Sequence, residues 1–279
     1  ADMPHLLVGG ATGSGKSAFI NSLICSMLFH ADPRRVRFLL VDPKRVELMP
    51  YAGMPHLLCP VITEPKKAAR ALRKLVHEME RRYVKLAEAG VRNLHSYWEK
   101  IEALDPEAEA LPAIVVVIDE LADLMLVAAN EVEDAIARLA QMARGVGIHL
   151  VFATQNPAVT VITGTIKANF PSRIAFRVTS MVNSRTILDT NGAEALLGRG
   201  DMLWHPAGLP KPERIQGCFV TTEDVRALVG HWREQIQTEY LMEGLGEVEA
   251  GETEGAEALD GGASDVQYQE AVRVIIQAQ

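Results

Sequence analysis

The sequence has few cysteines and few aromatic residues, and it lacks long apolar runs. Its three cysteines, Cys25, Cys59 and Cys218, stand far apart among 279 residues. This count and spacing argue against a disulfide framework or a CxxC metal site and favour a reducing compartment. No apolar stretch approaches the ~18 residues of a membrane helix. The N-terminus also lacks the basic-then-apolar pattern of a signal peptide. We therefore expect a soluble, cytoplasmic chain.

The composition is that of an ordinary globular protein, with 48% hydrophobic and 23% charged residues. The formal net charge of −8 is unevenly spread, because residues 243–264 hold seven acids and neither lysine nor arginine. The rest of the chain is close to neutral. A neutral body neither predicts nor excludes a nucleic-acid partner, since the placement of charge decides that question.

The distribution of charge and glycine predicts three segments. Residues 1–242 alternate between apolar runs and helical patterns and are interpreted as one domain. Residues 243–264, acidic and glycine-rich, are predicted to be a flexible linker. In residues 265–279, apolar side chains recur at helical spacing, which predicts the first helix of a further domain that this chain does not complete. We therefore interpret the chain as a fragment of a longer protein.

The body is predicted to be an α/β fold with a mostly parallel, doubly wound sheet flanked by helices. A long helix is expected over Pro65–Glu88, capped by Thr63 and exposing Arg81 and Arg82 to solvent. Another helix is expected to start at Thr221. The expected strands are His5–Gly9, Val36–Asp42, Ala113–Asp119, His149–Thr154, Arg173–Val178, Asp201–Trp204 and Arg214–Val220.

The run Gly10–Ser17 matches the phosphate-binding pattern GxxxxGK[ST] between a strand and a helix. Its glycines let backbone N–H groups converge on phosphate oxygens, and the following helix adds its positive end. Lys16 is expected to reach the β and γ phosphates of ATP, and the Ser17 hydroxyl to ligate Mg²⁺. The residues predicted to bind the nucleotide are Thr12, Gly13, Ser14, Gly15, Lys16, Ser17 and Ala18.

Polar side chains follow two of the other predicted strands. Asp119 and Glu120 come directly after the run 114–118, where Asp119 is expected to hold Mg²⁺ through water and Glu120 to accept a proton from the attacking water. Gln155 follows the strand at 149–154 and could sense the γ-phosphate or orient that water. On the residues alone, an ordinary loop glutamine explains Gln155 equally well.

Taken together, these motifs resemble the FtsK/SpoIIIE family of DNA translocases. The resemblance spans residues 3–220 in family order and is far more specific than the phosphate-binding loop alone. It rests on Met3–Ser17, Asp42–Lys44, Pro55–Leu58, Glu78–Tyr83, Val117–Asp123, Gly147–His149, Val161–Gly164, Ile166–Asn169, Ser172–Phe176, Ser184–Asp189 and Leu197–Leu203.

The resemblance implies a RecA-like, Mg-dependent ATPase motor that assembles into hexameric rings and pumps double-stranded DNA during chromosome segregation. ATP would bind between subunits, and Arg144 matches the family's arginine finger, which completes the neighbouring site. From the residues alone, Arg144 could equally be a cation favoured by a helix C-terminus. Lys167 and Arg185 match DNA-contact positions. Members of the family are anchored to the inner side of the membrane by an N-terminal region absent from this chain, and residues 265–279 resemble the start of their winged-helix domain.

Two positions depart from the family pattern. Asn156 and Met181 stand where members usually carry an arginine and a lysine that face DNA. About half of the usual phosphate contacts would then remain, so we expect weaker binding to duplex DNA. The alternative is that other loop cations, such as Arg173 or Lys44, compensate. The departures slightly favour a rival function, a secretion ATPase that moves a protein with the same core. A second rival is a nucleotide-binding assembly module without turnover. The residues that argue against it are the intact Lys16, Asp119, Glu120 and Gln155.

Overall fold

The structure, a computed structural model, describes residues 4–104 and 111–242, all of which belong to one compact unit. The predicted linker at 243–264 and the predicted winged-helix start at 265–279 lie outside the described residues. Within the described ranges, every helix is too short or too polar to cross a bilayer.

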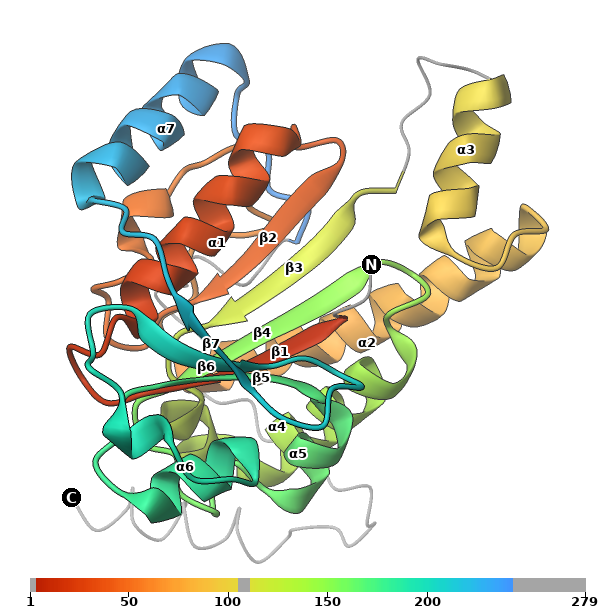
Figure 1. Ribbon diagram of the computed structural model, residues 1–279. Coiled ribbons are helices and arrows are strands. Elements are labelled where there is room, and N and C mark those ends of the chain that lie inside the picture. The colour runs from red at the N-terminus through yellow and green to blue at the C-terminus, as the bar shows by residue number, and fades with distance from the viewer. Residues whose placement is uncertain (1–3, 105–110, 243–279) are drawn as a thin grey trace, which may run out of the picture. The chain divides into compact units, whose positions relative to one another are not determined.

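A seven-stranded sheet forms the centre of this unit, in the order β2-β3-β4-β1-β5-β6-β7 (Figure 1). The first five strands in this order run parallel, and β6 and β7 are antiparallel to their neighbours. The mostly parallel sheet predicted from the sequence is thus confirmed. The strands are β1 His5–Gly9, β2 Val36–Val41, β3 Ala113–Ile118, β4 Ile148–Thr154, β5 Ser172–Phe176, β6 Asp201–His205 and β7 Glu213–Gln216.

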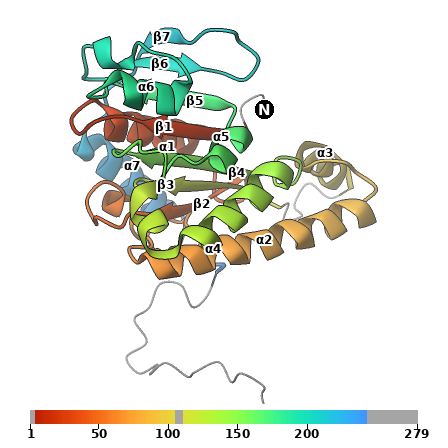
Figure 2. The ribbon, with the colours of Figure 1, turned by 90° about the horizontal axis from the view of Figure 1, so that it is seen from below.

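Helices cover both faces of the sheet (Figure 2). Alternate residues of each buried strand point to opposite faces, so Leu7 packs with α2 and α4, and Val8 packs with α1 and α7. The helices are α1 Lys16–His30, α2 Pro65–Glu88, α3 Leu94–Leu104, α4 Leu121–Met142, α5 Gly164–Asn169, α6 Met181–Leu188 and α7 Thr222–Gln235, with short 3-10 turns η1 Met49–Tyr51 and η2 Ala193–Ala195.

Two helix starts test the capping predictions. Thr221 caps α7 in a reciprocal arrangement with Asp224, as its sequence pattern indicated. The predicted cap of α2 by Thr63 is wrong, because the N-cap residue is Glu64. Its side chain forms an ion pair with Lys67. The residue before a proline is held in extended backbone, so the helix can begin only at Pro65 itself, one position too late for Thr63 to cap it.

Strand β7 is shorter than predicted, ending at Gln216 and not at Val220. The N–H of Gly217 still bonds to the carbonyl of Gly200 at 2.8 Å. Beyond it the chain leaves the sheet and crosses towards α1, where Cys218 and Phe219 line a pocket. The sequence pattern over residues 214–220 predicts one continuous strand, but Cys218 and Phe219 line the pocket and do not pair in the sheet.

Arg82 was predicted to lie on a solvent-exposed face, and that prediction is wrong. Its side chain is only 1% exposed. The guanidinium donates to Glu78 Oε1 at 2.7 Å and to the carbonyl oxygens of Pro112 at 2.8 Å and Val146 at 3.0 Å. Because Pro112 and Val146 lie just before β3 and β4, this one side chain ties α2 to the start of two strands.

We predict that Arg82→Ala lowers the free energy of unfolding by about 3–5 kcal/mol, because it leaves a carboxylate and two carbonyl oxygens without their buried donor. Urea denaturation monitored by circular dichroism measures this change. Arg81→Ala is the matched control, since Arg81 also binds Glu78 but is 54% exposed, and it should cost at most about 1 kcal/mol. Equal losses in the two variants would contradict the structural role of Arg82.

Two buried histidines predict a loss of stability in mild acid. Burial lowers the pKa of both His5 and His56 to about 4. The unfolded chain therefore binds more protons than the folded chain between the ordinary histidine pKa of 6.5 and about 4. Stability should be full at neutral pH and fall as pH drops through this window, by at most about 1.4 kcal/mol per histidine per pH unit. Denaturation midpoints at several pH values test this, and His56→Gln should flatten the slope.

Candidate functional site

The phosphate-binding loop joins β1 to α1, in the strand–loop–helix context that the motif requires. Gly13 and Gly15 adopt left-handed backbone, with φ of 73° and 108°. A Cβ atom on Gly15 would lie 2.3 Å from the backbone nitrogen of Gly200, so only glycine fits there. The N–H of Gly200 also donates to the carbonyl of Ser14 at 2.9 Å. The turn at residues 198–200 thus packs directly against the phosphate-binding loop and hydrogen-bonds to its backbone.

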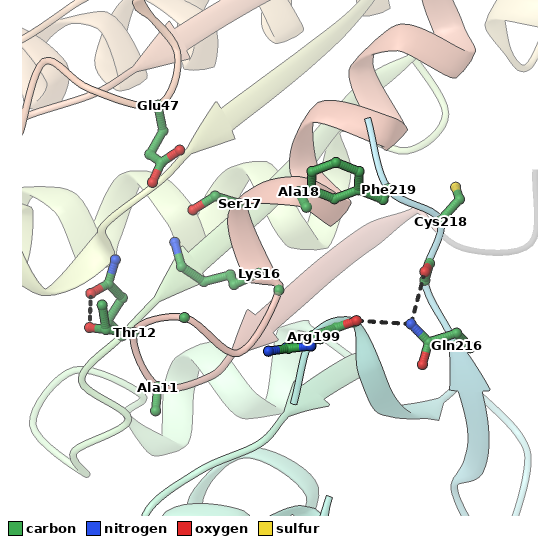
Figure 3. A pocket seen from close by; sticks show the side chains of 15 residues that line it. Ala11, Thr12, Lys16, Ser17, Ala18, Glu47, Arg199, Gln216, Cys218 and Phe219 are labelled. Carbon is green, nitrogen blue, oxygen red and sulfur yellow. Dashed lines mark hydrogen bonds between the residues drawn. The ribbon is translucent and has the colours of Figure 1, made fainter. Parts of the chain in front are cut away.

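A pocket of about 560 Å³ opens above this loop (Figure 3). Most residues predicted to bind the nucleotide line it, whereas Ser14 is buried within the loop. The lining residues from that prediction are Thr12, Gly13, Gly15, Lys16, Ser17 and Ala18. Figure 3 shows the Lys16, Ser17 and Glu47 side chains gathered on one side of this space. The arrangement has the size and the donor groups that a nucleoside triphosphate needs.

Lys16 and Asp119 form a buried ion pair at the floor of the site. Lys16 Nζ lies 2.6 Å from Asp119 Oδ1 and donates to the Asp119 backbone carbonyl at 2.8 Å. Among the described residues, Asp119 Oδ2 is buried without a hydrogen-bond partner. A buried carboxylate oxygen without a donor is costly. Together with the Ser17 hydroxyl, it is the kind of oxygen ligand that Mg²⁺ prefers, so the residues present fit that ion.

Glu120 follows Asp119 and is held by groups from the end of β4 and from the turn after β2. Its carboxylate accepts from Thr154 Oγ1 at 2.6 Å and from Lys44 Nζ at 3.0 Å. The backbone N–H of Gln155 also points at both of its oxygens. Burial by itself raises the pKa of Glu120, but these three donors outweigh it, and the pKa is lowered. The carboxylate is therefore ionised at neutral pH and able to accept a proton.

Gln155 lies between the strand end and the phosphate-binding loop. Its side-chain oxygen accepts from Thr12 Oγ1 at 2.8 Å, and the residue lines the pocket. The Gln155 amide thus faces the phosphate-binding loop, and its role as a sensor of the γ-phosphate stays a prediction. Asn156, the next residue, is exposed, and its N–H donates to Thr154 Oγ1 at 3.0 Å.

Arg144, Lys167 and Arg185 lie away from the pocket. Arg144 comes between α4 and the start of β4. It therefore lies where the parallel strands begin, whereas the phosphate-binding loop lies where β1 ends. Its charge acts on His5 and His149, at the starts of β1 and β4. Within one chain, Arg144 therefore does not complete the site formed by Lys16 and Glu120.

The two predicted DNA-contact residues lie near one another on α5 and α6. Lys167 forms an ion pair with Asp189, the left-handed residue that ends α6. Arg173 binds the same carboxylate and also donates to the Lys167 carbonyl at 2.9 Å. Arg185 is exposed and donates to Asn191 Oδ1 at 2.7 Å. Met181 begins α6 with 55% of its surface exposed.

Part of the pocket comes from residues that sequence reasoning did not single out as site residues. Phe219 is 79% exposed and stands beside Ala18 at the start of α1 (Figure 3). For the part of the pocket formed by Arg199 and Gly200, the available sequence signal is the pair of glycines at 198 and 200. Such a pair indicates a tight turn but does not indicate what the turn packs against. The missed lining residues outside the phosphate-binding loop are Glu47, Arg199, Gly200, Gln216, Gly217, Cys218 and Phe219.

Known proteins are similar to this chain in sequence. It is 58% identical to the DNA translocase FtsK of Oceanobacillus iheyensis over 245 residues, covering 86% of this chain and 31% of that protein. It is 53% identical to the DNA translocase SpoIIIE of Bacillus subtilis over 278 residues, covering 98% of this chain and 34% of that protein. The chain thus spans about a third of the length of these relatives.

Solved structures agree on the fold. The pCW3 conjugation coupling protein TcpA superimposes with a TM-score of 0.71 at 28% identity, covering 84% of this chain and 65% of that one. The cytoplasmic domain of the Type VII secretion ATPase EccC of Thermomonospora curvata gives 0.69 at 24% identity, covering 82% and 28%. A sequence model of the FtsK/SpoIIIE family matches residues 1–159. The chain therefore belongs to the FtsK/SpoIIIE family.

Proposed function

We propose that this chain is the motor domain of an ATP-driven translocase of double-stranded DNA, which acts in chromosome segregation and cell division. The observation that carries the proposal is the convergence of Lys16, Asp119 and Glu120 beside a pocket of nucleotide size. Relatives named DNA translocases, at 53–58% identity, support the choice of substrate.

The chemistry follows from the positions of these side chains. The loop N–H groups and Lys16 bind the phosphates of ATP, and the exposed ring of Phe219 offers a surface for the base. Ser17 and Asp119 would hold Mg²⁺, which neutralises phosphate charge when bound. Glu120 takes the proton from a water aligned by Gln155.

Arg144 acts in trans in this proposal. It lies where the parallel strands begin, at the other end of the sheet from the phosphate-binding loop. It can therefore meet a γ-phosphate only in the site of a neighbouring copy. A closed ring gives every subunit such a neighbour, and we infer a hexamer from the family. Lys167 and Arg185 would contact the phosphate backbone, which carries no sequence information and therefore suits a pump.

A secretion ATPase that moves a polypeptide remains the second candidate. The observation that favours it is the exposed surface of Asn156 and Met181, where a DNA pump of this family would present cations. An exposed methionine at the start of α6 suits an apolar peptide better than a phosphate.

We predict that Glu120→Gln lowers the kcat of ATP hydrolysis by about 10²–10⁴-fold and leaves the binding of a fluorescent ATP analogue intact, because the amide cannot accept the proton. Steady-state hydrolysis with and without long duplex DNA measures the loss. Glu131→Gln, which removes an exposed carboxylate from α4, is the control and should change little. A wild-type chain that binds the analogue but shows no turnover under either condition would favour the module without turnover.

We also predict that Asn156→Arg and Met181→Lys each tighten binding to duplex DNA. Each added phosphate contact should steepen the plot of log affinity against log salt by about 0.9. Lys167→Ala should flatten the same plot by a similar amount. Fluorescence anisotropy with a labelled duplex across a salt series measures these slopes. If none of the three variants changes the slope, these positions do not contact phosphate, and the secretion ATPase becomes the better proposal.

A further inference from the structure

The nucleotide pocket offers little positive charge of its own. Three charged residues line it within the part of the chain that the structure describes, namely Lys16, Glu47 and Arg199. The Lys16 ammonium is already paired with the Asp119 carboxylate at 2.6 Å, and Glu47 is itself an acid. A nucleoside triphosphate brings several negative charges, so it binds best where a further cation is not yet neutralised. Among the described lining residues, only Arg199 supplies such a cation.

The backbone of Arg199 is fixed beside the phosphate-binding loop in a strained conformation. Its φ of 54° is left-handed, which is costly for a residue with a Cβ atom. Its carbonyl oxygen accepts from Gln216 Nε2 at 2.9 Å (Figure 3), and the next residue, Gly200, donates to the Ser14 carbonyl at 2.9 Å. The same turn leaves no room for a Cβ atom on Gly15. These contacts hold the backbone of Arg199 at the wall of the pocket.

The guanidinium of Arg199, in contrast, is not held. Arg199 is exposed, and nothing within residues 4–104 and 111–242 forms a hydrogen bond or an ion pair with its guanidinium. A guanidinium presents five N–H donors in a fixed fork that matches the oxygens of a phosphate. A rigid backbone that presents an unpaired guanidinium to a pocket is therefore prepared to bind an anion.

The sheet order places Arg199 on the side of the loop away from the reacting phosphate. Asp119 and Glu120 follow β3 and Gln155 follows β4, all on one side of β1. Arg199 precedes β6, on the other side of β1 and beyond β5. In the proposed function the γ-phosphate meets the residues that follow β3 and β4. The part of the triphosphate nearest to Arg199 is then its α end.

We propose that Arg199 binds the α-phosphate of the nucleotide within its own subunit. The guanidinium donates to α-phosphate oxygens from the β6 side, while Lys16 reaches the β and γ phosphates. The inference rests on the proposed function, in which the pocket holds ATP. The α-phosphate takes no part in the bond that breaks, so this contact is the same before and during hydrolysis. It therefore strengthens binding without accelerating the chemical step.

The test measures the Kd of ATP, ADP and tripolyphosphate by isothermal titration calorimetry with Mg²⁺, for the 279-residue chain and its Arg199→Asn variant. Asparagine adopts left-handed backbone more readily than most residues, so the turn is kept while the guanidinium is removed. We expect all three ligands to bind about tenfold more weakly, because one charge-assisted hydrogen bond is lost. In steady-state hydrolysis, KM should rise about tenfold while kcat stays constant.

Two further variants accompany this test. Arg199→Gln, which keeps a longer polar side chain, should lose the same affinity. Arg177→Asn is the matched control, because Arg177 is an exposed arginine whose guanidinium would lie 3.6 Å from a Cβ atom on Gly198 in the same turn, yet it does not line the pocket. This control removes an equal charge and should leave every Kd within about twofold of the wild-type value, since exposed charges are screened.

The three ligands separate the possible outcomes. If ATP and ADP bind Arg199→Asn more weakly but tripolyphosphate does not, Arg199 contacts the base or the ribose, and the assignment to phosphate is overturned. A fall in kcat without a rise in KM would place the guanidinium at the γ-phosphate and overturn it as well. If both Arg199 variants bind all three ligands like the wild type, Arg199 is not a ligand of the nucleotide, while the proposed function survives. If the wild-type chain binds none of the three, the pocket is not a nucleotide site, and both ideas fail together.

Discussion

The buried ion pair between Lys16 and Asp119 holds the candidate site together. Lys16 begins α1 directly after the phosphate-binding loop, whereas Asp119 follows β3, and β4 lies between these two strands in the sheet. Two buried charges are stable only while they remain paired, so the loop cannot drift from the strand end that carries Glu120. The positions of the nucleotide pocket and of the candidate base are therefore set by one contact across three strands.

Much of the fold could be predicted from the sequence because its determinants are local. The apolar runs of β1 to β5 are buried on both faces and fell within two residues of their observed ends. The glycines at 13 and 15 predicted a tight loop before a helix. In the structure both have the left-handed backbone conformation that glycine adopts most easily. The pattern Thr221 to Asp224 predicted a helix start for the same reason, since the cap is made within four residues.

Apart from the Thr63 cap, which the neighbouring proline rules out locally, the errors arose where segments distant in the sequence decide the outcome. Arg82 looks like a surface residue in its own helix, and its burial is favourable because the carbonyl oxygens of Pro112 and Val146 accept from it in addition to Glu78. Glu47, Arg199 and Phe219 reach the pocket from three separate connections, and no local pattern relates them. The sequence also could not show that Lys44 pairs with Glu120, because that contact depends on how the turn after β2 lies against the end of β3.

Asp189 places a competing carboxylate beside Lys167, one of the two residues predicted to contact DNA. Its carboxylate already binds Lys167 and Arg173, so a phosphate arriving at Lys167 would replace one anion with another. Such an exchange leaves the number of ion pairs unchanged, so the free energy that it contributes to phosphate binding is small. Under the proposed function, a DNA phosphate bound by such an exchange would be released as readily as it is bound. If the chain is the DNA motor proposed above, which would have to release its substrate at each step, a lysine with a competing carboxylate beside it would suit that work better than a lysine without one.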